Sequence, residues 1–168
     1  MSLMTIGMLF VTGVLLHNTE ECLYLPQWAV RHGRRSVPPS NFFIAALLMS
    51  ALLLAFGFGA LYQGPQSVWA YLFCGYVLAM AANTLVPHVL ASIATRSYSP
   101  GTATAMLFNF PLGIWFLVAS VRSGFVQPPT IWWAAPSVAA GIALCVPVSF
   151  ALAALLVRHL RVGCRSAT

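Results

Sequence analysis

The sequence predicts an all-α membrane protein, a compact bundle of five transmembrane helices. Of the 168 residues, 60% are hydrophobic and only 6% are charged, whereas a soluble domain carries about 25% charged residues. The mean hydropathy of +0.87 agrees. Five apolar runs also approach the roughly 20 residues that a helix needs to cross a bilayer. We therefore expect one domain over residues 1–168, with spans at about 3–25, 41–61, 68–95, 102–121 and 132–157.

The first predicted span ends in polar residues and a proline. Residues 3–16 carry no charge, and the next turns hold the stretch His17-Asn18-Thr19-Glu20-Glu21, which contains both acidic residues of the chain. Pro26 lacks the backbone N–H that a continuing helix uses, so we expect the helix to end just before it. A basic loop over residues 31–35 follows.

The remaining spans are separated by short turns. Residues 62–67 form an uncharged turn, and Trp69 then begins the third span with a ring typical of a membrane interface. Trp132 begins the fifth span in the same way. Pro87 lies inside the third span, where it removes a backbone hydrogen bond and can distort the helix.

The arginines predict the orientation. With five spans, the basic loop 31–35, Arg96 and the tail after residue 157 fall on one side, and Arg122 falls on the other. Because cytoplasmic loops carry the excess of basic residues, we expect the N-terminus outside and the C-terminus in the cytoplasm. The net charge of +6 then reflects membrane topology rather than nucleic-acid binding. We expect a multi-pass protein of the cytoplasmic (inner) membrane of a bacterium.

Polar residues of three spans fall at a similar depth, toward the cytoplasmic side. On the first span, His17 precedes Glu20 by three residues and Glu21 by four, so both carboxylates flank its face of the helix. The other polar candidates lie on the third and fourth spans: Asn83, His88, Thr102, Thr104 and Asn109. We therefore expect the first, third and fourth spans to be neighbours around a common polar site.

The residue types at this depth indicate metal binding or acid–base chemistry. Two histidines and a carboxylate form a familiar ligand set for iron or zinc, and manganese is a third candidate. The predicted metal ligands are His17, Glu20, Glu21 and His88. Without a metal, His17, Glu20 and Glu21 are the candidate catalytic acid and base. Asn83, Thr102, Thr104 and Asn109 are expected to orient ligands or substrate.

A structural interpretation of the same residues stays open. Glu20 and Glu21 can extend to the headgroups and pair with arginines of the basic loop. His88 can be a buried, hydrogen-bonded histidine. Thr104 and Asn109 can form hydrogen bonds between helices.

At these residues the sequence resembles the HXXEE family of small integral membrane proteins, whose function is uncharacterised. His17-Asn18-Thr19-Glu20-Glu21 matches the motif that names the family, and residues 100–104 resemble its Pro-Gly-x-x-Thr element. Asn83 and His88 are candidates for its asparagine–histidine element. The similarity extends over about residues 3–109. It implies a compact helical membrane domain with a polar site.

From these patterns we expect a membrane-embedded, metal-dependent enzyme, either a hydrolase or an oxidoreductase, without a nucleotide cofactor. Its site would lie near the cytoplasmic side and take a lipid-like or other apolar small-molecule substrate, with membrane lipid as its surroundings. One alternative is a small proton-coupled transporter, because buried glutamate and histidine also relay protons. The other is a structural or partner-binding membrane subunit with a buried polar cluster.

Overall fold

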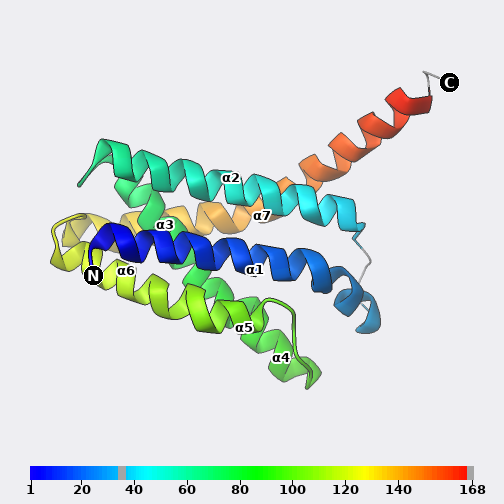
Figure 1. The fold of residues 1–168 in the computed structure, drawn as a ribbon, viewed down its shortest axis with the longest axis horizontal. Coiled ribbons are helices and arrows are strands. Elements are labelled where there is room, and N and C mark those ends of the chain that lie inside the picture. Colours follow the sequence, from blue (N-terminus) through cyan, green and yellow to red (C-terminus); the bar gives the residue numbers. More distant parts are fainter. Residues whose placement is uncertain (34–36, 166–168) are drawn as a thin grey trace.

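The computed structural model describes residues 1–33 and 37–165, apart from the side chains of residues 160–165. Its regular elements are all helical (Figure 1): α1 Leu3–Arg31, α2 Pro39–Gln63, α3 Val68–Asn83, η1 Thr84–Val89, α4 Leu90–Thr95, α5 Thr102–Thr104, η2 Ala105–Asn109, α6 Phe110–Arg122 and α7 Pro128–Arg165. Five helical stretches among the described residues are long and apolar enough to cross a membrane: 3–31, 39–63, 68–95, 102–122 and 128–159. The prediction of a helical bundle with five candidate spans is confirmed.

The expectation that the first helix ends before Pro26 is wrong. α1 continues through this proline to Arg31. A proline inside a helix removes one backbone hydrogen bond, and membrane helices tolerate it where the surrounding protein compensates. Here both Pro26 and Trp28 are buried, so packing of the last turns outweighs the lost bond. α7 also begins earlier than expected, at Pro128.

Aromatic side chains from α1, α3 and α6 form the centre of the bundle. The ring of Phe73 lies 6.3 Å from that of Phe10 and 5.0 Å from that of Phe116, centroid to centroid, in both cases edge to face. Gly7 lets Phe116 approach α1, because a Cβ at Gly7 would lie 3.2 Å from the Phe116 ring. In a membrane such close packing, rather than removal of surface from water, holds helices together.

The fifth span packs against the third at its start and departs from the bundle at its end. A Cβ at Gly75 of α3 would collide with the side chain of Val138 on α7, so the two backbones approach closely there. Small residues allow this approach between membrane helices. The C-terminal half of α7, orange to red in Figure 1, extends away from the other helices.

Two π-helical segments, η1 and η2, contact one another in the half of the bundle that holds the polar residues. Within η1 the backbone of Val86 is extended, with φ −130° and ψ 112°. The residue before a proline is driven out of the helical region by the ring of Pro87. The predicted distortion at Pro87 is therefore present, and the turn after it carries His88 into the interior, where 2% of it is exposed.

Candidate metal centre

Three polar side chains from α1 and η1 converge in the interior. One ligand atom from each of His17, Glu21 and His88 lies within 4.8 Å of the other two. Oxygens of Glu21 lie 3.8 Å from Nε2 of His17 and 3.3 Å from Nε2 of His88. The two imidazole rings are 4.7 Å apart between centroids and cross at 86°. The structure thus brings together three of the four predicted metal ligands.

The two imidazoles are buried, and three of their four nitrogens make no hydrogen bond within the described residues. His17 is fully buried, and within the described residues its Nε2 and both nitrogens of His88 make no hydrogen bond. Burying a polar nitrogen without a partner costs free energy, and coordination of a metal ion would supply that partner. Metal–ligand bonds of about 2.0–2.2 Å place adjacent ligand atoms about 3–4 Å apart. The observed distances from Glu21, 3.3 and 3.8 Å, fit this requirement.

The carbonyl of Gly101 determines which nitrogen of His17 is free. Nδ1 of His17 lies 3.0 Å from this oxygen. A carbonyl oxygen only accepts, so Nδ1 must carry the hydrogen, and Nε2 keeps its lone pair toward Glu21. Metal-binding histidines commonly donate their second ring N–H to a backbone carbonyl in this way. His17 therefore has the tautomer that a metal ligand requires.

Gly101 lies directly against all three side chains. Its φ of +91° is in the left-handed region that favours glycine. A Cβ at this position would lie 2.7 Å from Cε1 of His88, 2.8 Å from Cε1 of His17 and 3.1 Å from Cγ of Glu21. Gly101 ends the connection between α4 and α5, residues 96–101, which lies close to both imidazoles. This position requires glycine for two reasons, backbone conformation and space.

Glu20, also a predicted ligand, lies outside this group of three. Its carboxylate accepts hydrogen bonds from the hydroxyl of Tyr98 and, at 2.7 Å, from the hydroxyl of Thr104. Consecutive helical residues point about 100° apart, so the two glutamates face different neighbours. Tyr98 belongs to the connection between α4 and α5, and burial together with its hydrogen bond to Glu20 raises the pKa of its hydroxyl. The hydroxyl thus remains a donor.

The two predicted threonines support the ligands from outside. The hydroxyl of Thr104 lies 3.3 Å from Nδ1 of His17 and 3.2 Å from the Gly101 oxygen. The hydroxyl of Thr102 donates to the backbone carbonyl of His88 at 3.4 Å. Both threonines therefore act on the residues that hold the imidazoles rather than on the ligand atoms.

Among the described residues, neither predicted asparagine hydrogen-bonds to the three ligands. Asn83 is half-buried at the end of α3, five residues before His88, and its side chain does not cap the segment that follows. Asn109 is fully buried, and its amide oxygen lies 3.6 Å from where a Cβ of Gly13 would be. Gly13 is one helical turn from His17. Neither amide atom of Asn109 hydrogen-bonds within the described part of the chain, so it is a buried amide about one turn away from the three ligands.

Sequence reasoning missed Tyr98 and Ser92, which both hold the loop over the imidazoles. The Ser92 hydroxyl accepts a hydrogen bond from the backbone N–H of Ser99 at 3.1 Å. The connection over residues 96–101 has only six residues. Every side chain in so short a connection must lie at the ends of the spans, at the depth of Glu20. Its length was the signal that could have identified Tyr98.

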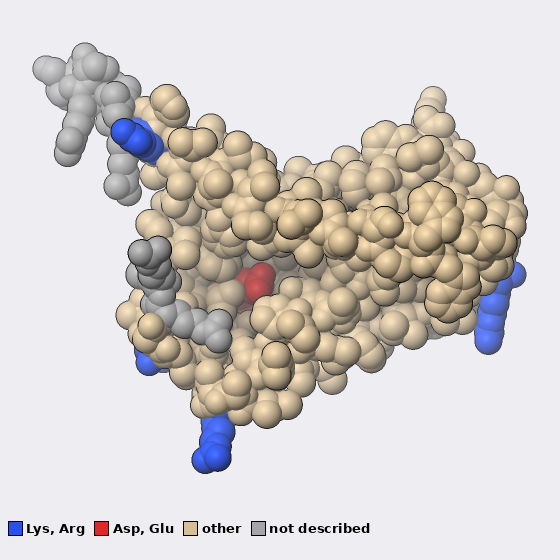
Figure 2. Space-filling view, turned by 180° about the vertical axis from the view of Figure 1, so that it is seen from behind, with Lys and Arg blue, Asp and Glu red and all other residues tan. Residues whose placement is uncertain are grey.

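The acidic residues lie at the bottom of a hollow on the side of the bundle (Figure 2). Glu20 and Glu21 are the two acidic residues of the chain, so the red atoms in this view are theirs. The side chain of Glu21 is 21% exposed, whereas both imidazoles are buried. The helices run across this view, so the hollow opens on the flank of the bundle rather than at one of its ends.

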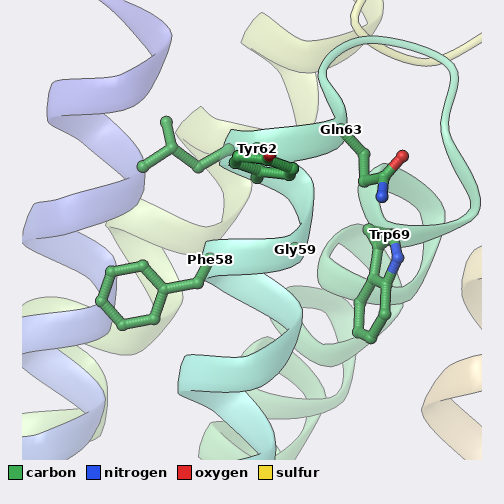
Figure 3. A pocket seen from close by; sticks show the side chains of 6 residues that line it. Phe58, Gly59, Tyr62, Gln63 and Trp69 are labelled. Atoms are coloured by element: carbon green, nitrogen blue, oxygen red, sulfur yellow. The ribbon is translucent and has the colours of Figure 1, made fainter.

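Two further cavities lie near the opposite half of α1. One, of about 670 Å³, lies at the end of α2, where Trp69 of α3 lies beside Gly59 (Figure 3). The other, of about 530 Å³, lies between the first half of α1 and the second half of α2 and is lined mainly by apolar side chains. The described residues that line these cavities include no acid and no histidine. Neither cavity offers metal ligands.

One of the comparisons with known proteins covers this site. Residues 8–116 match a family model described as "Protein of unknown function with HXXEE motif". A Bacillus subtilis (strain 168) protein named "Uncharacterized protein YrkK" is 30% identical over 105 residues, which are 61% of this chain and 66% of the relative. The chain thus spans just under two thirds of the length of this curated relative. No solved structure matches. The family match includes all the site residues described above, and α7 lies outside it.

Proposed function

The chain belongs to the HXXEE family, and we propose that it is a membrane-embedded enzyme in which His17, Glu21 and His88 bind a divalent metal ion. The observation that carries this proposal is the convergence of two buried imidazoles, without hydrogen bonds at Nε2 within the described residues, on one carboxylate. Two histidines and a carboxylate suit iron, zinc or manganese. When bound, such an ion supplies a Lewis acid that polarises a substrate oxygen.

The residues in and around the metal centre have different proposed roles. The Gly101 carbonyl holds the Nδ1 hydrogen of His17, so that Nε2 stays available as a ligand. Burial keeps bulk water away from both imidazoles, whereas the side chain of Glu21 is 21% exposed and is the part of the three-residue site that a substrate would meet first. Glu21 is also the residue best placed to move a proton to or from a substrate there.

We propose a lipid-like or other apolar substrate. The hollow that contains the acidic residues opens on the flank of the bundle (Figure 2), and this flank would face the bilayer if the five stretches span it. A substrate dissolved in the bilayer would reach the site without crossing water. The metal would help to separate the two enzyme classes, because zinc has no redox chemistry and would indicate hydrolysis, whereas iron would favour oxidation.

We further propose that the protein resides in the cytoplasmic membrane of a bacterium with its N-terminus outside. Arg31 ends α1 and Arg96 follows α4, both on the side of the metal centre, and Arg122 ends α6 on the opposite side. Basic residues concentrate on the cytoplasmic side. Two arginines of the predicted basic loop lie outside the described residues, namely Arg34 and Arg35. A green fluorescent protein fused to the C-terminus should fluoresce, and alkaline phosphatase at the same place should be inactive.

Metal analysis of the purified protein tests the central claim. We expect stoichiometric iron, zinc or manganese in the wild type, and loss of the metal in His17→Ala, Glu21→Gln and His88→Ala. His32→Gln is a matched control, because both nitrogens of His32 already have partners, at 2.8 Å and 3.0 Å. This variant should retain the metal. A wild-type protein free of all three metals, with stability unchanged by chelator, would refute the metal enzyme.

Further variants separate the alternative functions. A proton-coupled transporter would give uptake into reconstituted vesicles that disappears in Glu20→Gln, without any turnover of substrate. A structural or partner-binding subunit would lose assembly or stability when Glu21 or His88 is replaced by an apolar residue. Neither alternative requires bound metal.

A further inference from the structure

Glu20 links α1 to both ends of residues 98–104, the loop that lies against the imidazoles. One carboxylate oxygen accepts from the Tyr98 hydroxyl, and the other accepts from the Thr104 hydroxyl at 2.7 Å. Tyr98 lies three residues before Gly101, and Thr104 lies three residues after it. The Tyr98 hydroxyl also accepts from the backbone N–H of Ala103 at 3.1 Å, which closes the loop on itself.

This arrangement places Gly101 midway between two hydrogen bonds to one side chain. Gly101 is the residue whose carbonyl accepts from His17 and whose Cα lies against both imidazoles. Hydrogen bonds to a carboxylate are roughly twice as strong as those between neutral groups. The position of the Gly101 carbonyl relative to His17 therefore depends on the carboxylate three residues along the same helix.

The loop is attached on its other side to α4. The Ser92 hydroxyl accepts from the N–H of Ser99 and lies 3.1 Å from the hydroxyl of Thr102. Thr102 in turn donates to the carbonyl of His88. Without Glu20, the loop would stay joined to the segment that carries His88 but would lose its side-chain attachment to α1 through the carboxylate. We therefore expect loss of Glu20 to change the orientation of His17 more than that of His88.

We propose that Glu20 and Tyr98 are positioning residues, which hold the loop over residues 98–104 so that the Gly101 carbonyl keeps His17 in the tautomer that binds metal. The inference rests on the proposed metal centre for its functional meaning. It assigns different roles to the two adjacent glutamates, with Glu21 as a ligand and Glu20 as the clamp of the loop. It also assigns a role to Tyr98, which is 53% exposed and touches no ligand atom of the centre.

Cobalt(II) titration tests the clamp, with the visible absorption of the ion as the signal. Glu20→Gln and Tyr98→Phe should each bind Co²⁺ about 10- to 100-fold more weakly than the wild type, the usual effect of losing a partner of a metal-binding histidine. Tyr24→Phe is the matched control, since Tyr24 lies one turn along α1 from Glu20 and is 58% exposed. It should bind Co²⁺ as the wild type does. If Glu20→Gln does not fold, Tyr98→Phe decides the matter, because it removes one oxygen and keeps the carboxylate.

A second measurement reports on His17 without any metal. In ¹⁵N NMR of the metal-free protein, His17 should carry its hydrogen on Nδ1 in the wild type and in Tyr24→Phe, but should populate both tautomers in Tyr98→Phe. If the wild type binds no Co²⁺ yet the tautomer changes as expected, the proposed metal function fails and the clamp stands. If the wild type binds Co²⁺, and both affinity and tautomer are unchanged in Glu20→Gln and Tyr98→Phe, the clamp is overturned.

Discussion

Replacing Gly101 by alanine should damage both the stability of the protein and its metal site. At φ +91° an alanine is strained, which costs about 1–2 kcal/mol. The added methyl group would also lie 2.7 Å and 2.8 Å from ring carbons of His88 and His17. Imidazole rings cannot bend away, so the rings or the loop must shift, at a typical overpacking cost of about 1–3 kcal/mol. The expected loss in the free energy of unfolding is therefore about 2–5 kcal/mol.

Gly124→Ala separates the cost of backbone strain from the cost of contact with the imidazoles. Gly124 has a φ of +71°, but a Cβ there would meet nothing within 4 Å, so its replacement should cost only the backbone strain of about 1–2 kcal/mol. Both variants would be unfolded reversibly in mixed detergent micelles without metal and then titrated with Co²⁺. Gly101→Ala should be the less stable of the two and should alone lose affinity. Equal destabilisation with equal affinity would refute the claim that Gly101 packs against the imidazoles.

Three further outcomes are expected. Co²⁺ affinity should fall in acid, because histidine binds metal only in its neutral form; an affinity that stays constant down to the pH at which the protein unfolds would argue against histidine ligands. Chelator should lower the midpoint of thermal unfolding of the wild type but not of His88→Ala, since only a bound ion can stabilise the fold by mass action. Gly75→Ala should destabilise the protein by about 1–3 kcal/mol, because its Cβ would meet Val138. Its control is Gly141→Ala, where the added Cβ has open space around it, and this variant should be neutral or stabilising by up to about 1 kcal/mol. Equal unfolding curves for Gly75→Ala and Gly141→Ala would contradict the packing of α3 on α7.

Composition and run length were sufficient to predict the helices but not all of their ends. Five apolar runs predict five candidate spans, and the structure contains them. The continuation of α1 to Arg31 goes with the burial of Pro26 and Trp28. Burial depends on how the whole chain packs, and no local pattern contains that information. The propensity of proline to end helices was therefore a poor guide at this position.

The candidate site could be predicted in part, because depth follows from topology. His17 and His88 lie on spans that run in the same direction, and counting residues from the span ends puts them at a similar level. Glu20 and Glu21 flank the face of the helix that carries His17 and point about 100° apart, so their roles depend on which span lies next to each of them. Local spacing does not contain that information. Asn83 lies five residues before His88, so the two do not share a face of a regular helix. Their relative position depends on the distortion at Pro87, where the backbone of Val86 is extended.

The loop that closes over the imidazoles also sets an order for biogenesis. α1 carries His17 and Glu21, but His88 and Gly101 are synthesised only after the intervening spans. The imidazole of His17 therefore cannot acquire its hydrogen-bond acceptor, or meet the second imidazole, until the third span and the start of the fourth have been made. Metal loading belongs after that point, and a chain arrested after α2 would contain only two of the three ligands, His17 and Glu21.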